Sequence, residues 1–176
     1  MTTDEAHTST NVLQLNQSLV SGIIEGTNLG LQMTGVEPIP IGATAFSPTP
    51  SDISVTVGLI GRSNGSLTLN LSKQAMFYLT GQLLCEQVNE ESEDVYDAVM
   101  EIGNMVGGCV KDILAESEFQ LTHISVPSLI MGSNYNVYFS RGITNVSIIF
   151  EMPEFKTVAE SSRYFTVTVS LLRQIA

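Results

Sequence analysis

The sequence is poor in basic residues and contains no tryptophan. Only 7 of its 176 residues are Lys or Arg, against 18 that are Asp or Glu, so its formal net charge at pH 7 is −11. A surface this acidic repels the phosphates of nucleic acids and anionic lipid head groups. We therefore expect neither nucleic-acid binding nor membrane-surface binding.

Long hydrophobic runs are absent as well. No window approaches the ~18 uninterrupted apolar residues that a membrane span requires. The first ten residues, MTTDEAHTST, are polar, and they lack the basic and apolar regions of a signal peptide. We therefore expect a cytoplasmic protein.

Cysteine and histidine are scarce, which restricts the chemistry that the chain can perform. Cys85 and Cys109 are too few for a disulfide scaffold, and we expect both to be reduced, small core residues. The histidines are His7 and His123, and no Cys/His grouping has the spacing of metal ligands, so we expect no metal site. The serine-nucleophile motif G-x-S-x-G is also missing. We predict that the chain has no cofactor of its own.

The chain is long enough for one domain with a sizeable core. Residues 1–10 are predicted to be a disordered tail, and residues 11–176 are predicted to form a single domain. From Asn11 onward, apolar residues recur every three or four positions and predict a helix that ends near Gly30. Residues 36–51 contain four prolines and are expected to be an extended, non-helical connector.

A hairpin and a short helix are predicted next. Two alternating runs, 53–59 and 67–71, flank Ser63-Asn64-Gly65, which has the composition of a turn. Ser72 is expected to cap a helix over residues 73–87. The residues of this helix expected to be buried are Met76, Leu79, Leu83 and Leu84.

A second long helix is predicted from the acidic cluster at 89–94 to about Glu116, because acids in a first turn favour the positive end of the helix dipole. Gly107-Gly108 lies inside this helix without the preceding strand of a phosphate-binding loop. We expect the glycine pair to let a helix or a partner backbone approach closely.

The rest of the sequence predicts strands, over 121–131, 135–139, 145–152 and 164–172. Long helices combined with hairpin-connected strands predict an α+β fold with a mostly antiparallel sheet, two long helices and one shorter helix. The last strand has no Lys, Glu or Pro to protect an exposed edge. We expect it either to lie inside its own sheet or to pair across the two-fold axis of a homodimer.

Asp97, Glu101 and Asn104 form the one group that indicates a chemical function. They stand at positions i, i+4 and i+7 of the second long helix and project within ~60° of one another, opposite its apolar face. The carboxylate can pair with a cation, and the carboxamide one turn away can both donate and accept hydrogen bonds.

The first helix repeats this spacing with Ser21, Glu25 and Asn28. A proline follows each asparagine, Pro50 after 22 residues and Pro127 after 23, and the two motifs are 76 residues apart. This pattern predicts an internal duplication of a helix plus strands. A single E-x-x-N on an amphipathic helix is usually a solvated face, but two copies favour a function.

The pattern Asp97-x3-Glu101-x2-Asn104-x22-Pro127 resembles the signature of the CheC/CheX/FliY family of chemotaxis phosphatases. The segment DAVMEIGNMVGGCVKDIL looks closest to the CheX-like branch. The resemblance covers roughly 11–173 and implies a CheC-like fold with internal pseudo-two-fold symmetry. In the first copy Pro50 comes one residue early. CheX-type chains carry one site and CheC-type chains carry two, so the number of sites stays open.

Proteins of this family hydrolyse the aspartyl phosphate of a response regulator such as CheY. The resemblance implies that Asn104 orients the attacking water, that Glu101 pairs with a lysine of the regulator and that Asp97 supports them. Glu25 and Asn28 would form the equivalent pair of a second site. Mg²⁺ would be supplied by the regulator.

The partners implied are a phosphorylated CheY-like regulator, a second copy of the chain and a CheD-like protein. Three alternatives remain. The chain could bind a regulator without turnover, as in sequestration or in a flagellar switch. Its client could be a regulator outside chemotaxis, and the second motif favours a CheC-like monomer over a homodimer.

Overall fold

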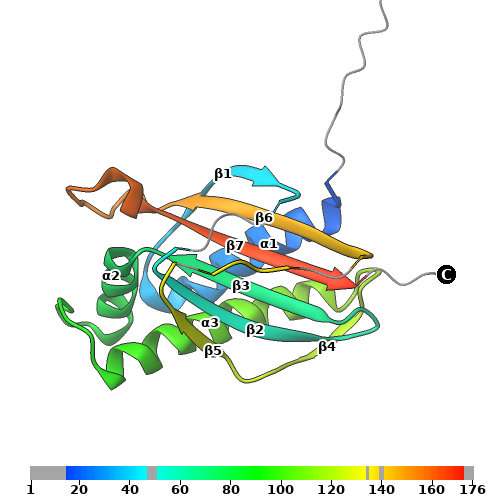
Figure 1. Cartoon of the computed structure of the whole chain (residues 1–176), viewed down its shortest axis with the longest axis horizontal. Helices are drawn as coiled ribbons and strands as arrows, with labels where there is room; N and C mark the ends of the chain where they lie inside the picture. Colours follow the sequence, from blue (N-terminus) through cyan, green and yellow to red (C-terminus); the bar gives the residue numbers. More distant parts are fainter. Residues whose placement is uncertain (1–14, 47–50, 134, 139–140, 173–176) are drawn as a thin grey trace, which may run out of the picture.

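The computed structural model describes residues 15–46, 51–133, 135–138 and 141–172. An antiparallel sheet forms one layer, and the two long helices lie side by side against one of its faces (Figure 1). The helices are α1 (Gln17–Gly30), α2 (Lys73–Leu84) and α3 (Glu93–Leu114), with short 3-10 turns η1 (Gln32–Thr34) and η2 (Glu160–Arg163). The strands are β1 (Ile39–Thr44), β2 (Ile53–Gly61), β3 (Gly65–Leu71), β4 (Leu121–Ile124), β5 (Ser128–Met131), β6 (Ile143–Glu151) and β7 (Tyr164–Leu172).

Each helix begins where a side chain caps it. Asn16 Oδ1 accepts a hydrogen bond of 2.9 Å from the Leu19 backbone N–H, and α1 begins one residue later. The Ser72 cap predicted for α2 is confirmed, since its hydroxyl accepts a 3.0 Å bond from the Ala75 N–H. Ser92 caps α3. The start predicted for the first helix, at residue 11, lies outside the described residues.

The strand order confirms the internal duplication predicted from the sequence. The order across the sheet is β1-β6-β7-β3-β2-β4, with β5 also paired to β2. The first half of the chain runs α1-β1-β2-β3, and the second runs α3-β4-β5-β6-β7. The two halves correspond strand by strand: β1 to β4 and β5, β2 to β6, and β3 to β7. When each strand is replaced by its counterpart, the strand order of the sheet is the same but read from the opposite edge. The fold is therefore pseudo-two-fold symmetric, with α2 as an addition to the first half.

Several predicted strand boundaries need correction. The connector predicted over 36–51 contains the edge strand β1, and Pro40 is tolerated there beside an irregularity in the pairing with β6 because an edge strand leaves one side unpaired. The strand predicted over 121–131 is two strands separated at residues 125–127. Residues 135–138 form no strand, contrary to expectation, and residue 139 lies outside the described residues.

The edge-strand argument for a homodimer is wrong for β7. This strand pairs along its length with β6 on one side and with β3 on the other. Its freedom from charged residues follows from this central position, where side chains on the helix-facing side are buried. Exposed hydrophobic side chains instead lie on the edge strand β1, where Ile39 and Ile41 are about half exposed, and on β5, where Ile130 and Met131 are 40% and 48% exposed.

Glycines bring the two long helices into close contact. Gly22, Gly26 and Gly30 of α1 face Leu114, Val110 and Val106 of α3, so the helices run antiparallel. A methyl group at Gly26 would lie 2.7 Å from both Val110 N and Val110 Cα. These glycines therefore allow backbone-to-backbone packing that a Cβ atom would prevent.

The approach of a helix or partner backbone predicted at Gly107-Gly108 is not found among the described residues, since Gly107 faces a side chain of the sheet. A methyl group at Gly107 would lie 3.2 Å from Val57 Cγ1 of β2, whereas one at Gly108 would meet no atom within 4 Å. Gly107 and Gly103 thus let α3 lie close to the sheet, while Gly108 faces open space.

Candidate functional site

The polar face of α3 carries the predicted group. Asp97 and Glu101 are exposed and Asn104 is half-buried, while Ile102 and Val106 on the opposite face are fully buried. Asn104 Nδ2 donates a hydrogen bond of 3.4 Å to Glu101 Oε2. The carboxylate and the carboxamide therefore form one unit, with further hydrogen-bonding capacity directed to solvent.

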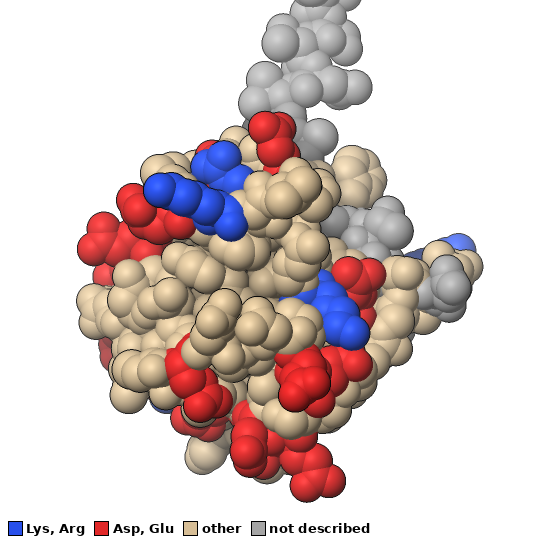
Figure 2. All heavy atoms as spheres, turned by 90° about the vertical axis from the view of Figure 1, so that its left-hand side faces the viewer, with Lys and Arg blue, Asp and Glu red and all other residues tan. Residues whose placement is uncertain are grey.

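A depression of about 540 Å³ lies beside this unit, between the end of α2 and the start of α3. The apolar part of its lining is Leu83, Leu84 and Ala98, and the acidic part is Glu86, Asp94, Asp97 and Glu101. Figure 2 faces this end of the molecule and shows acidic side chains gathered in its lower part. Within the described chain, Glu101 forms no ion pair, so its charge is available to a cationic partner.

The contribution of α2 to this depression is missed by sequence reasoning. Leu84 is predicted to be buried, but its side chain is 39% exposed and lines the depression. The predicted end of this helix, at residue 87, is wrong: α2 ends at Leu84, and Cys85 after it adopts a left-handed conformation at φ 55°. An apolar side chain in the last turn of a short helix has less of the core to pack against.

The second predicted group lies on α1, where Ser21, Glu25 and Asn28 are all exposed. Unlike their counterparts on α3, the Glu25 and Asn28 side chains are joined by no hydrogen bond in the described structure. Asn28 stands in the last turn of α1 and borders a cavity of about 610 Å³, whose lining includes Glu37 and Glu154. The two asparagines therefore differ in that only Asn104 is hydrogen-bonded to the glutamate of its motif in the described structure.

The structure does not bring the two motifs together. Asn28 precedes Gly30 by two residues and Asn104 precedes Val106 by two residues, and Gly30 and Val106 are in contact. At 100° per residue, each asparagine points ~160° away from that contact. We infer that the two side chains lie on opposite flanks of the helix pair. Pro127 lies between β4 and β5, and Pro50 lies outside the described residues.

The two cysteines, both in the part of the chain that the structure describes, do not add a second reactive group. Cys85 is exposed, so its expected place in the core is wrong, and Cys109 is half-buried. Burial, together with the Asp112 carboxylate, raises the pKa of the Cys109 thiol, which disfavours the nucleophilic thiolate. In the ranges that the structure describes, no three His, Cys, Asp or Glu side chains are grouped as metal ligands. No helix in those ranges has the length and apolar character to span a membrane.

Fold and site together define a class of protein: a pseudo-symmetric α+β domain that presents a glutamate and an asparagine, one turn apart, on a long surface helix. The family described as "Chemotaxis phosphatase CheX" matches residues 53–151, which is more than half of the chain. The chain therefore belongs to the CheX family. The matched region contains Glu101 and Asn104. It begins after α1, so it does not include the other motif.

Solved structures with the same fold come from several bacteria. A chemotaxis protein CheX from Desulfovibrio desulfuricans is 26% identical, with a TM-score of 0.71, over 87% of this chain and 98% of that one. CheX in a CheX–CheY–BeF3–Mg²⁺ complex from Borrelia burgdorferi is 20% identical, with a TM-score of 0.70, over 91% and 100%. FliY of Thermotoga maritima is 14% identical, with a TM-score of 0.62, over 90% and 92%. No curated protein sequence matches this one.

Proposed function

We propose that this chain hydrolyses the aspartyl phosphate of a CheY-like response regulator. The observation that supports this most directly is the Glu101–Asn104 unit, exposed on α3 and free of any cationic partner among the described residues. Membership of the CheX family supports the same activity, as does the similarity of the fold to a CheX that forms a complex with CheY.

The chemistry requires little from this chain beyond positioning. A water oxygen attacks the phosphorus, the bond from phosphorus to the aspartyl oxygen breaks, and the products are inorganic phosphate and a free aspartate. The regulator would contribute Mg²⁺ and a lysine to stabilise the phosphoryl charge. Asn104 would hold the water in line with the departing carboxylate, since its amide can accept from the water and donate to a phosphoryl oxygen.

Glu101 and Asp97 would act in recognition. Glu101 would pair with the lysine of the regulator and fix the approach of α3, and its hydrogen bond with Asn104 links this ion pair to the water-positioning amide. Asp97, one turn earlier on the same face, would support the interface. The Leu83 and Leu84 side chains beside them offer apolar surface for the same partner.

A regulator-binding protein without turnover is the alternative. The deciding experiment is phosphate release from phosphorylated CheY-like regulators, with this chain at substoichiometric concentration. Many phosphates released per chain would support an enzyme. Release limited to the spontaneous rate, together with measurable binding, would support the alternative.

Replacing Glu101 by lysine is expected to raise KM for the phosphorylated regulator by about tenfold or more, because like charges would meet at the proposed ion pair. Stability should change little, since the side chain is exposed. Steady-state phosphate release measures the effect, and Glu116→Lys, the same charge change at an exposed site beyond α3, is the control. Equal kinetics for both variants would show that Glu101 is only a solvated residue.

We retain the homodimer as a proposal, now through the β1 edge. Ile39 and Ile41 are exposed there, and β1 has no charged residue, a combination that favours pairing with a second chain. Light scattering should give about 38 kDa, twice the chain mass, and Ile41→Lys should reduce it to 19.0 kDa. Val158→Lys, at a fully exposed apolar residue outside the described strands, is the control. A wild-type mass of 19.0 kDa at micromolar concentration would contradict the dimer.

A further inference from the structure

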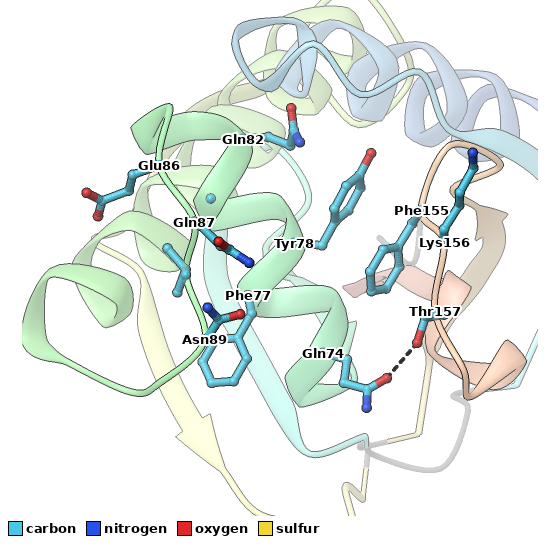
Figure 3. A pocket seen from close by; sticks show the side chains of 12 residues that line it. Gln74, Phe77, Tyr78, Gln82, Glu86, Gln87, Asn89, Phe155, Lys156 and Thr157 are labelled. Carbon is cyan, nitrogen blue, oxygen red and sulfur yellow. Dashed lines mark hydrogen bonds between the residues drawn. The ribbon is translucent and has the colours of Figure 1, made fainter.

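A second concave surface lies on the other side of α2, at the same end of the molecule (Figure 3). We call it the aromatic groove. It encloses about 580 Å³ between α2, the segment after α2 and the segment that joins β6 to η2, a volume within the ~300–1,000 Å³ range of small-molecule sites. Its lining is Gln74, Phe77, Tyr78, Gly81, Gln82, Glu86, Gln87, Val88, Asn89, Phe155, Lys156 and Thr157.

Aromatic rings form the apolar part of the groove. The Tyr78 and Phe155 rings stack with their centroids 4.4 Å apart and their planes 13° apart. Both rings are only half-buried, as is Phe77, over which the Lys73 ammonium lies at 5.7 Å. Half-exposed, preorganised rings offer surface on which another planar group can stack.

Neutral hydrogen-bonding groups line the rest of the groove. The Gln74 side chain accepts a 2.8 Å bond from the Thr157 hydroxyl, which ties α2 to the facing segment. The carboxamides of Gln82, Gln87 and Asn89 have no hydrogen-bond partner within the described structure. Such amides pair with the edges of heteroaromatic bases, because both have adjacent donors and acceptors.

The two ends of the groove differ in charge. Lys156 stands at one end and forms no ion pair with the described residues, in a chain of net charge −11. Figure 3 shows Gln87 and Asn89 on the opposite wall, while the Glu86 carboxylate points outward. Burial and, to a lesser extent, the nearby Glu154 carboxylate raise the pKa of Tyr78. A ligand with a planar polar ring at one end and an anionic group at the other matches this arrangement.

We propose that the aromatic groove binds a small anionic heteroaromatic molecule of the nucleoside monophosphate class. The ring would stack on an outer face of the Tyr78–Phe155 pair, its edge would pair with the carboxamides, and its phosphate would pair with Lys156. The site is separate from Glu101 and Asn104. It is adjacent to them through Glu86, which lines both the aromatic groove and the depression beside Glu101.

The test is titration of the full chain with AMP, followed by calorimetry and by NMR shifts of the groove residues. AMP should bind, adenosine should bind about tenfold more weakly, and ribose 5-phosphate should not bind, because the ring and the phosphate are both recognised. Lys156→Ala should weaken AMP binding about tenfold while leaving adenosine binding unchanged. Lys111→Ala, which removes a half-buried lysine near the end of α3 that pairs with Asp112, is the control.

Asn89→Ala provides a second variant in an exposed loop that should not disturb folding, and it should weaken AMP and adenosine equally. No AMP binding up to ~10 mM would overturn the proposal. Ribose 5-phosphate binding as tightly as AMP, or equal losses in Lys156→Ala and Lys111→Ala, would also overturn it. No regulator is present in this experiment, so its outcome is independent of the phosphatase activity.

Discussion

Replacing Asn104 by alanine is expected to lower the rate of regulator dephosphorylation by on the order of 10²-fold, the usual effect of removing one group that positions a reacting atom. The fold should survive, since the side chain is half-buried and its one hydrogen bond in the described structure is to the neighbouring Glu101. Phosphate release under single-turnover conditions measures the chemical step without the contribution of binding.

Asn28→Ala is the matched control because it removes the same side chain at the equivalent position of α1. We expect it to have a small effect, since Asn28 lacks the hydrogen bond to its glutamate and borders two further carboxylates, Glu37 and Glu154. A loss equal to that of Asn104→Ala would show a two-site chain. Full activity with both asparagines replaced would contradict the mechanism.

Gly26→Ala is expected to lower the free energy of unfolding by ~1–3 kcal/mol, because the added methyl group overpacks the contact between α1 and α3. The clash is with the Val110 backbone at 2.7 Å, so rotation of a side chain cannot relieve it. Urea denaturation followed by far-UV circular dichroism gives the midpoint and slope from which the change is obtained.

Gly108→Ala is the control within α3. It has open space around it, so the substitution should stabilise the protein by ~0.5–1 kcal/mol through the better helix propensity of alanine. Helix propensity alone would make both substitutions stabilising, because both glycines are helical. A destabilising Gly26→Ala beside a stabilising Gly108→Ala therefore reports the helix contact. If Gly26→Ala were as stabilising as Gly108→Ala, the close approach of the two helices would be contradicted.

Local signals predicted much of the fold and of the candidate site. Ser72 was recognisable as a cap, the turn at 63–65 separates two strands as expected, and α3 was placed within a few residues. The spacing of Glu101 and Asn104 sufficed to place both on the polar face of one helix, because helical geometry fixes the angle between them. The hydrogen bond between them does not follow from the spacing alone, since Glu25 and Asn28 have the same spacing on α1 and form none in the described structure.

What the sequence did not reveal depends on contacts between distant segments. Prolines made β1 look like a connector, since only its partner β6 shows that it is an edge strand. The central place of β7 depends on its pairing with β3, which no local pattern encodes. The depression beside Glu101 and the aromatic groove were missed for the same reason: α2 forms part of each together with residues far away in the chain.

The reversed strand order has a consequence for how this chain reaches its native state. Each half contributes one local hairpin, β2–β3 or β6–β7. Among the described residues, however, β1 pairs only with β6, and β4 and β5 pair only with β2. The central contact, β3 with β7, also joins the two halves. Neither half therefore contains a complete sheet that could fold on its own before the other half has folded. The sheet forms only after a long loop has closed, which makes folding slow. During that interval the outer strands of one chain are open to the matching half of another.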